Sequence, residues 1–89
     1  MESALANEYT RICRDPATHQ PLAYLRLRRA IRNVVEHRDI EPGQALPSER
    51  DLSQALKLSR VTVRKAVRVL REEGLVVTVA QRGSYVARN

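Results

Sequence analysis

The sequence has no phenylalanine, no tryptophan and only three tyrosines among its 89 residues. Leucine, valine, isoleucine and alanine must therefore fill the core of the one small domain that this length predicts. Cys13 is the only cysteine. A single cysteine excludes an internal disulfide and a cysteine-rich metal site, which fits the reducing cytoplasm where we expect the protein to act.

Motifs for catalysis and for membrane insertion are also missing. His19 and His37 lie far apart, and the sequence has neither a glycine-rich phosphate loop nor a nucleophile motif. We therefore expect no enzymatic activity and no cofactor. No apolar run approaches the roughly 18 residues of a membrane span, and the N-terminal stretch lacks the basic start and apolar segment of a signal peptide.

Positive charge is what the sequence has in excess. Sixteen lysines and arginines against ten acidic residues give a net charge of +6 and a pI near 10.4. Such a balance favours a polyanionic partner, either nucleic acid or, less often, an anionic membrane surface. The charge is concentrated, because six basic residues and no acidic one lie between Leu52 and Arg71.

Residues 1–20 are interpreted as an N-terminal extension that precedes the domain at 21–89. Four side chains recur in the extension at helical spacing: Leu5, Tyr9, Ile12 and Cys13. They indicate a short amphipathic helix, which Asp15-Pro16 would end. A frayed leader fits the same residues equally well.

A first helix of the domain is predicted over residues 22–38. Its apolar stripe consists of Tyr24, Leu27, Ile31, Val34 and Val35, and four arginines lie mostly off that stripe. The turn dipeptide Pro42-Gly43 follows. Residues 44–46 are a candidate short strand.

Two more helices are predicted, with only three residues between them. The first spans 48–56 and is capped by Ser48, whose hydroxyl can accept the backbone N–H of Asp51 while the Asp51 carboxylate bonds back. The second spans 60–73 and is capped by Ser59. The residues expected to face inward are Leu52, Ala55 and Leu56 on the first helix, and Val63, Ala66, Val67 and Leu70 on the second.

The hydrophobic period changes after Gly74, a natural helix end. The segments LVVTV and SYVA flank the turn AQRG, which predicts a hairpin with strands at about 75–79 and 84–87. The fold class expected from this order of elements is mainly α with a small β-hairpin, a winged helix-turn-helix.

The basic helix has a function in such a fold. Two helices joined by so short a turn cross steeply, which leaves one face of the second helix free. That free face is predicted to carry Arg60, Val61, Arg64, Lys65 and Arg68. A helix fits the major groove of B-DNA with its first turn nearest the base edges, where arginine can bond to guanine and valine can touch a thymine methyl.

The hairpin would then be the wing. Its tip is Gln81-Arg82-Gly83. Arg82 can enter the narrow minor groove, and Gly83 lets the backbone approach the DNA. An arginine at a turn tip more often has no function when taken by itself. A capping serine more often only caps its helix than binds a phosphate, so these features are informative only together.

The sequence resembles the DNA-binding domain of the GntR family of bacterial transcription regulators from about Pro21 to Val86. The matching stretches are PGQALPSERDLSQAL, SRVTVRKAVRVLREEGL and RGSYV. The resemblance implies that a homodimer binds palindromic double-stranded operator DNA, as a repressor or an activator. It also implies a C-terminal domain that dimerises or binds a small-molecule effector. We therefore expect an N-terminal piece of a longer regulator rather than a naturally short protein.

The same resemblance implies individual contacts. Arg50, the arginine of the PSER motif, is expected near the phosphate backbone and base edges. Arg60 and Arg64 are expected to read bases, and Ser59 and Thr62 to hold phosphates. The complete set of predicted DNA-binding residues is Ser48, Arg50, Ser59, Arg60, Val61, Thr62, Arg64, Lys65, Arg68, Arg82 and Gly83.

Two positions depart from the family pattern or indicate a branch of it. Many members carry Gly-x-Gly in the wing, where this sequence has Gln81 as the first residue of the three, which predicts a stiffer or differently shaped wing. Lys65 stands where one large branch often has glutamate. This favours the branch with a chorismate-lyase-like effector domain, the HutC type.

Two other functions stay open, since winged helices also serve as protein-interaction and RNA-binding modules. A protein-binding version should present an apolar face, whereas this face is cationic with one valine. A reader of single-stranded RNA stacks bases on aromatic rings, and all three tyrosines lie outside the basic helix. We expect no membrane partner, because the core needs the apolar face of that helix.

Overall fold

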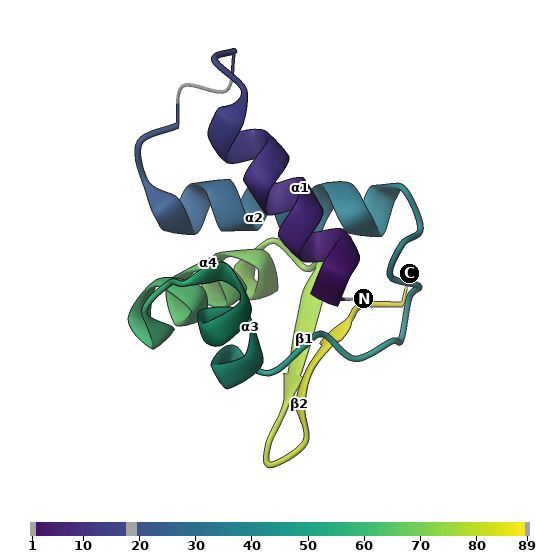
Figure 1. Cartoon of the computed structure of the whole chain (residues 1–89). Helices are drawn as coiled ribbons and strands as arrows, with labels where there is room; N and C mark the ends of the chain where they lie inside the picture. Colours follow the sequence, from purple (N-terminus) through teal and green to yellow (C-terminus); the bar gives the residue numbers. More distant parts are fainter. Residues whose placement is uncertain (1, 18–19, 89) are drawn as a thin grey trace.

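The computed structural model describes residues 2–17 and 20–88, which form four helices and one two-stranded antiparallel hairpin (Figure 1). The elements are α1 (Glu2–Arg14), α2 (Ala23–Glu36), α3 (Glu49–Leu56), α4 (Arg60–Glu72), β1 (Val76–Val79) and β2 (Gly83–Val86). The predicted fold class, mainly α with a small hairpin, is confirmed. None of the helices within the described ranges is long and apolar enough to cross a membrane.

The N-terminal extension is helical and packs on the domain. Leu5, Tyr9 and Ile12 are buried in the common core, whereas Cys13 is exposed. Helix α1 ends directly before Asp15-Pro16, as the sequence predicts. A frayed leader is therefore the wrong alternative for residues 4–14, whose apolar side chains complete the core.

A polar contact fixes α1 against α2. The Glu8 carboxylate accepts hydrogen bonds from Nη2 of Arg11 and from Nδ2 of Asn33, both at 2.6 Å. The bond from Arg11 lowers the pKa of Glu8 most, and the bond from Asn33 lowers it further. Burial raises this pKa, but the two bonds outweigh it and bring the pKa from 4.5 to about 2. This half-buried carboxylate is therefore ionised at neutral pH and stabilises the packing of the two helices.

Helices α2 and α4 provide most of the remaining core, and their predicted stripes are confirmed. The buried side chains are Leu27, Ala30, Ile31 and Val34 on α2, and Val63, Ala66, Val67 and Leu70 on α4. On α3, Leu52 is buried and Leu56 is half-buried, but Ala55 is exposed. The expectation for Ala55 is wrong because the core side of this two-turn helix lies between Leu52 and Leu56.

The turn between α3 and α4 is closed by local bonds. Lys57 ends α3 in the left-handed conformation, with φ of 57°. The backbone N–H of Leu58 donates to the Ser53 carbonyl at 3.1 Å, and the Ser53 hydroxyl donates to the Leu58 carbonyl at 2.5 Å. Ser59 then caps α4. These bonds hold α4 at one angle to α3.

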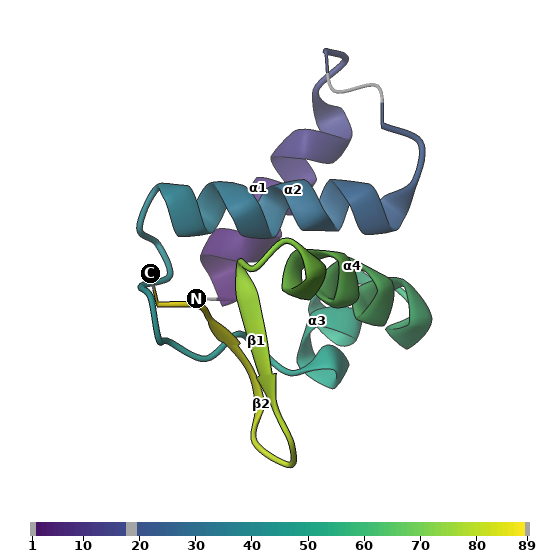
Figure 2. The same ribbon diagram turned by 180° about the vertical axis from the view of Figure 1, so that it is seen from behind.

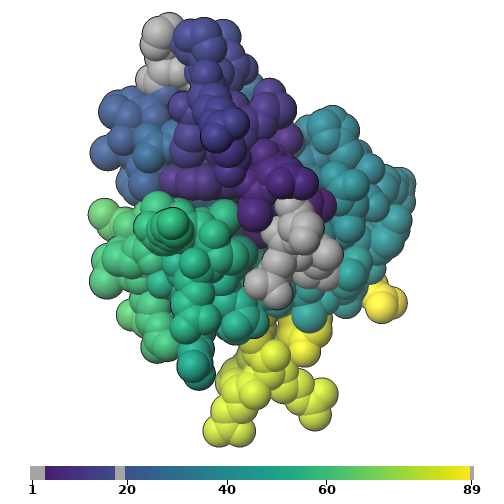
Figure 3. All heavy atoms as spheres, in the orientation of Figure 1, coloured from purple at the N-terminus to yellow at the C-terminus, as the bar shows by residue number. Residues whose placement is uncertain are grey.

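The hairpin projects from the helical body, on the side opposite α2 (Figures 1 and 2). Val76 pairs with Val86 at its base, and Val79 pairs with Gly83 near its tip. The strand expected at 44–46 is a single bridge between Ala45 and Tyr85. Figure 3 shows that the tip protrudes as a narrow arm below α3 and α4.

Candidate nucleic-acid interface

Four arginines form a row along the exposed side of α4: Arg60, Arg64, Arg68 and Arg71. Their spacing of four, four and three residues places them on one side of the helix. Over eleven residues the row is about 17 Å long. Val61 lies in the first turn beside it, with 64% of its surface exposed. The helix therefore presents a cationic side with one apolar contact near its N-terminus.

The first turn of α4 carries two linked hydroxyls. The Ser59 oxygen accepts the backbone N–H of Thr62 at 3.1 Å and lies 2.9 Å from the Thr62 hydroxyl. The predicted cap is thus confirmed. Because the first N–H groups of a helix lack carbonyl partners and carry a partial positive charge, this end of α4 attracts an anion.

The start of α3 lies next to the arginine row. Ser48 caps α3 by accepting the Asp51 N–H at 3.0 Å, but a bond from the Asp51 carboxylate back to Ser48 is not found in the described part of the chain. Arg50 is exposed in the first turn. Glu49 reaches α4 and accepts from Nη2 and Nε of Arg64 at 3.1 and 3.3 Å. This bond raises the pKa of Arg64.

The contact between Glu49 and Arg64 is a feature that sequence reasoning missed. The two residues are 15 positions apart, and only the crossing of α3 and α4 brings them together. The only sign of this contact in the sequence is a glutamate in the same motif as Arg50. The pair gives one predicted base-reading arginine a defined direction before any ligand binds.

Lys65 lies apart from the arginine row. Its Nζ is 5.2 Å from the centroid of the Tyr24 ring, a cation–π contact that joins α4 to α2. Lys65 is therefore directed to the α2 side of the helix, while Arg68 remains exposed within the row.

The wing tip keeps a tight turn although it contains a glutamine. Arg82 N–H donates to the Val79 carbonyl at 3.0 Å, and Gln81 has φ of 65°. A positive φ at the third turn position only is the pattern of a type II turn, where glycine is preferred. Gln81 thus adopts the backbone conformation that glycine takes without strain. Arg82 and Gly83 are exposed beside it.

A groove of about 270 Å³ lies between the start of α3, α4 and the wing. Its polar lining includes Ser48, Glu49, Thr78 and Ser84, with Val67 of α4 among its apolar residues. The structure therefore brings the start of α3 and the arm of the wing to the same cavity, next to α4.

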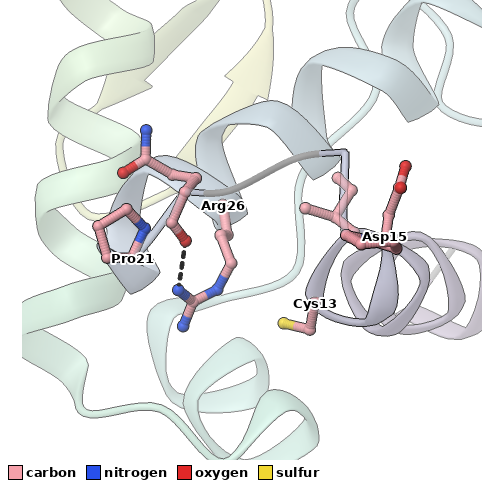
Figure 4. A pocket seen from close by; sticks show the side chains of 7 residues that line it. Cys13, Asp15, Pro21 and Arg26 are labelled. Carbon is pink, nitrogen blue, oxygen red and sulfur yellow. Dashed lines mark hydrogen bonds between the residues drawn. The ribbon is translucent and has the colours of Figure 1, made fainter.

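A larger cavity, of about 510 Å³, lies between the end of α1 and the start of α2 (Figure 4). Arg26 crosses it and donates to the Gln20 carbonyl at 2.7 Å, with Cys13 and Asp15 on the other side. This cavity is remote from the wing. In the described ranges, no three His, Cys, Asp or Glu side chains form a group that could hold a metal ion.

Comparisons with known proteins agree with this geometry. The sequence model of the bacterial regulatory proteins of the gntR family matches residues 23–86. The HTH-type transcriptional regulator GgaR of Escherichia coli (strain K12) is 41% identical over 70 residues, which are 79% of this chain and 28% of GgaR. The mannosyl-D-glycerate transport/metabolism system repressor MngR of the same strain is 38% identical over 68 residues, or 76% of this chain and 28% of MngR.

Two solved structures share the fold. The AraR DNA-binding domain in complex with operator ORX1 has a TM-score of 0.74 and 31% identity, over 83% of this chain and 88% of that one. YtrA from Sulfolobus acidocaldarius, a GntR-family transcription factor, has a TM-score of 0.74 and 31% identity, over 84% and 78%. The winged helix-turn-helix is thereby confirmed. This chain spans just over a quarter of the length of GgaR and MngR, and it belongs to the gntR family of bacterial regulatory proteins.

Proposed function

We propose that this chain is the DNA-binding domain of a bacterial transcription regulator and binds double-stranded operator DNA in a sequence-specific manner. The observation that carries the proposal is the arginine row of α4, beside the exposed Val61. Only Arg64 in this row has an acidic partner among the described residues. The other three arginines have no ion-pair partner there. Their charges lie within about 17 Å of one another and repel, so a polyanion is the partner that relieves them.

The docking that fits this surface places α4 in the major groove with its first turn at the base edges. Arg60 and Arg64 read guanine, and Val61 touches a thymine methyl. The hydroxyls of Ser59 and Thr62 face a phosphate. Ser48, Arg50 and Arg68 contact the DNA backbone on either side of this groove. Lys65 lies at the edge of the interface, because it contacts the Tyr24 ring.

The wing approaches the adjacent minor groove. Arg82 supplies a cation, and Gly83, with φ of 108°, leaves room for the backbone to approach. The minor groove separates A·T from G·C but not the two orientations of a pair. The wing therefore adds affinity and a preference for groove width more than a sequence code.

The whole regulator extends this proposal. A homodimer places two such domains on a palindromic operator in the cytoplasm, and a C-terminal domain binds a small-molecule effector. Repression is the favoured direction of control, because MngR of E. coli and NagR of Bacillus subtilis are named repressors. The Lys65 signature favours a HutC-type effector domain.

Selection of bound sequences from random duplexes tests the proposal. We expect enrichment of one half-site that contains guanine, with its mirror image on the opposite strand. A pool that stays random after several rounds contradicts sequence-specific binding. Stronger capture of single-stranded RNA than of any duplex favours the RNA-binding alternative instead.

A further inference from the structure

A second polar cluster lies between the last turn of α4 and the arm of the wing. Nη1 of Arg71 donates to the Thr78 hydroxyl at 3.2 Å, and the Thr78 and Ser84 hydroxyls are 3.2 Å apart. Thr78 and Ser84 are direct cross-strand partners. These three residues could not be selected from the sequence, because strand register and helix position together bring them into contact.

The cluster has more donors than it uses. Arg71 has five N–H donors, and one of them is used among the hydrogen bonds of the described residues. The two hydroxyls supply two O–H groups and need only one for their mutual bond, so one is free to donate outward. A planar guanidinium next to a hydroxyl matches the oxygens of a phosphate.

Nearby carboxylates do not neutralise the cluster. Glu49 lines the same groove, but it is paired with Arg64. Glu73 is paired with Arg28 and Arg32 on the α2 side. No ion pair of the described residues includes Arg71, so its charge remains available to an anion.

The proposed docking brings a DNA strand to this position. One sugar-phosphate strand separates a major groove from the adjacent minor groove. If α4 occupies the first and the wing tip the second, that strand must cross the groove between α4 and the hairpin. Thr78 and Ser84 line this groove, and the bond from Arg71 to Thr78 ties the last turn of α4 to the hairpin beside it.

We propose that Arg71, Thr78 and Ser84 form a phosphate-binding site for the DNA strand that passes between α4 and the wing. The site rests on the proposed function, since its ligand is a backbone phosphodiester of the bound duplex. It fixes the position of the wing relative to α4 on the DNA, and it reads no base.

Single methylphosphonate replacements along the selected duplex test this site, because each removes one backbone charge. Arg71→Gln removes the cation and keeps hydrogen bonding. Thr78→Val removes the hydroxyl and keeps the shape. Arg29→Gln is the matched control, because Arg29 is an exposed arginine. It belongs to α2, the helix that lies opposite the projecting hairpin (Figures 1 and 2).

We expect the wild type to lose about three- to tenfold in affinity when the phosphate between the two grooves is neutralised. Arg71→Gln should weaken binding to the selected duplex and to the random duplex equally. The loss should be about as large as that caused by neutralising the phosphate. Its salt slope should be smaller by about one, and it should no longer respond to that neutralisation. Thr78→Val should respond less at the same phosphate, and Arg29→Gln should behave as the wild type.

An Arg71→Gln protein with wild-type affinity and wild-type sensitivity at every phosphate overturns the site and leaves the proposed function intact. A loss confined to the selected sequence also overturns it, because Arg71 would then read a base. Failure of the wild type to bind any duplex contradicts both proposals. Circular dichroism of each variant verifies folding, and Arg71→Lys, which keeps the charge, should retain the salt slope.

Discussion

Arg60 is the residue on which the proposed base recognition depends most directly. It is exposed in the first turn of α4, next to Val61, and the structure shows no acidic partner for it in the described residues. Arg64, one turn later, is already held by Glu49. Arg60 is therefore the arginine of the first turn that has no ion-pair partner among the described residues and can adjust to a guanine edge.

Arg60→Ala should cost specific binding on the order of 1–3 kcal/mol and relax the preference at one base pair per half-site. The reason is the loss of a bidentate contact to one guanine. Titration of the selected and a scrambled duplex measures both effects. Equal weakening on the two duplexes would identify Arg60 as a phosphate contact.

Gln81 is strained at the tip of the wing. A non-glycine residue in the left-handed region loses about 1 kcal/mol or more relative to glycine, whereas glycine adds entropy to the unfolded chain. Gln81→Gly should therefore raise the free energy of unfolding by about 0.5–1 kcal/mol. Arg82→Gly, at a neighbouring position without a positive φ, should not stabilise the protein. Chemical denaturation of both variants decides, and equal effects would mean that the turn releases no strain at Gln81.

At the scale of elements, α1 is part of the folded unit through its apolar side chains and through Glu8. The Glu8 side chain is 14% exposed, and its folded-state pKa of about 2 lies below the ordinary 4.5. A carboxylate whose pKa is lowered by folding stabilises the folded state at pH values above its ordinary pKa. This stabilisation is lost as the pH falls through the folded-state pKa.

Glu8→Gln should lower the free energy of unfolding by about 1–2 kcal/mol at neutral pH, and its difference from the wild type should vanish as the pH approaches 2. Glu72→Gln is the control, because Glu72 is exposed on α4 and no ion pair of the described residues includes it. Denaturation at several pH values measures the difference. A constant difference between Glu8→Gln and the wild type would show that ionisation of Glu8 does not stabilise the fold.

The elements were predictable where the signal is local. Hydrophobic period, capping serines and Gly74 placed α2, α3 and α4 within two residues of their observed ends, and the change of period placed the hairpin within one. Helix α1 was ambiguous, because a short amphipathic segment becomes a helix or a frayed leader according to whether its apolar face finds a partner. Ala55 was misplaced because the direction of the core depends on neighbouring helices.

The site was predictable as a surface but not as a set of contacts. The cationic face of α4 follows from its sequence alone. The partners of its side chains do not, since Glu49 with Arg64, Tyr24 with Lys65 and Thr78 with Arg71 are joined only by tertiary packing. These pairs distinguish an arginine that is already oriented from one that is free.

For the chain as a whole, the described residues leave no extended apolar surface for a stable dimer. Leu5, Tyr9 and Ile12, which the sequence alone leaves available, are buried. The exposed large apolar side chains of the described chain are Leu22, Val61, Val77 and Val79. They lie on three separate elements or segments, so we expect the free 89-residue chain to be largely monomeric.

A coiled coil attached after Asn89 should tighten binding to the full palindrome by about 10²–10⁴-fold, because the second domain then binds at a high effective concentration. Each domain should contribute a log–log salt slope of about −4 to −5, from roughly four to six phosphate contacts. Sedimentation of the free chain and titration of one-site and two-site duplexes test this. A stable dimer of the free chain at micromolar concentration, or a tethered pair that gains nothing on the palindrome, contradicts it.

In the proposed complex α4 occupies the major groove while the wing lies at the adjacent minor groove. Methylation by dimethyl sulfate distinguishes the two contacts, since guanine N7 lies in the major groove and adenine N3 in the minor groove. We predict protection of guanine N7 within each half-site, lost in Arg60→Ala at one guanine. We also predict protection of adenine N3 next to the half-site, lost in Arg82→Ala with little change in sequence preference. Protection of adenine N3 without any protected guanine N7, or a bound duplex with neither, would show that α4 does not occupy the major groove.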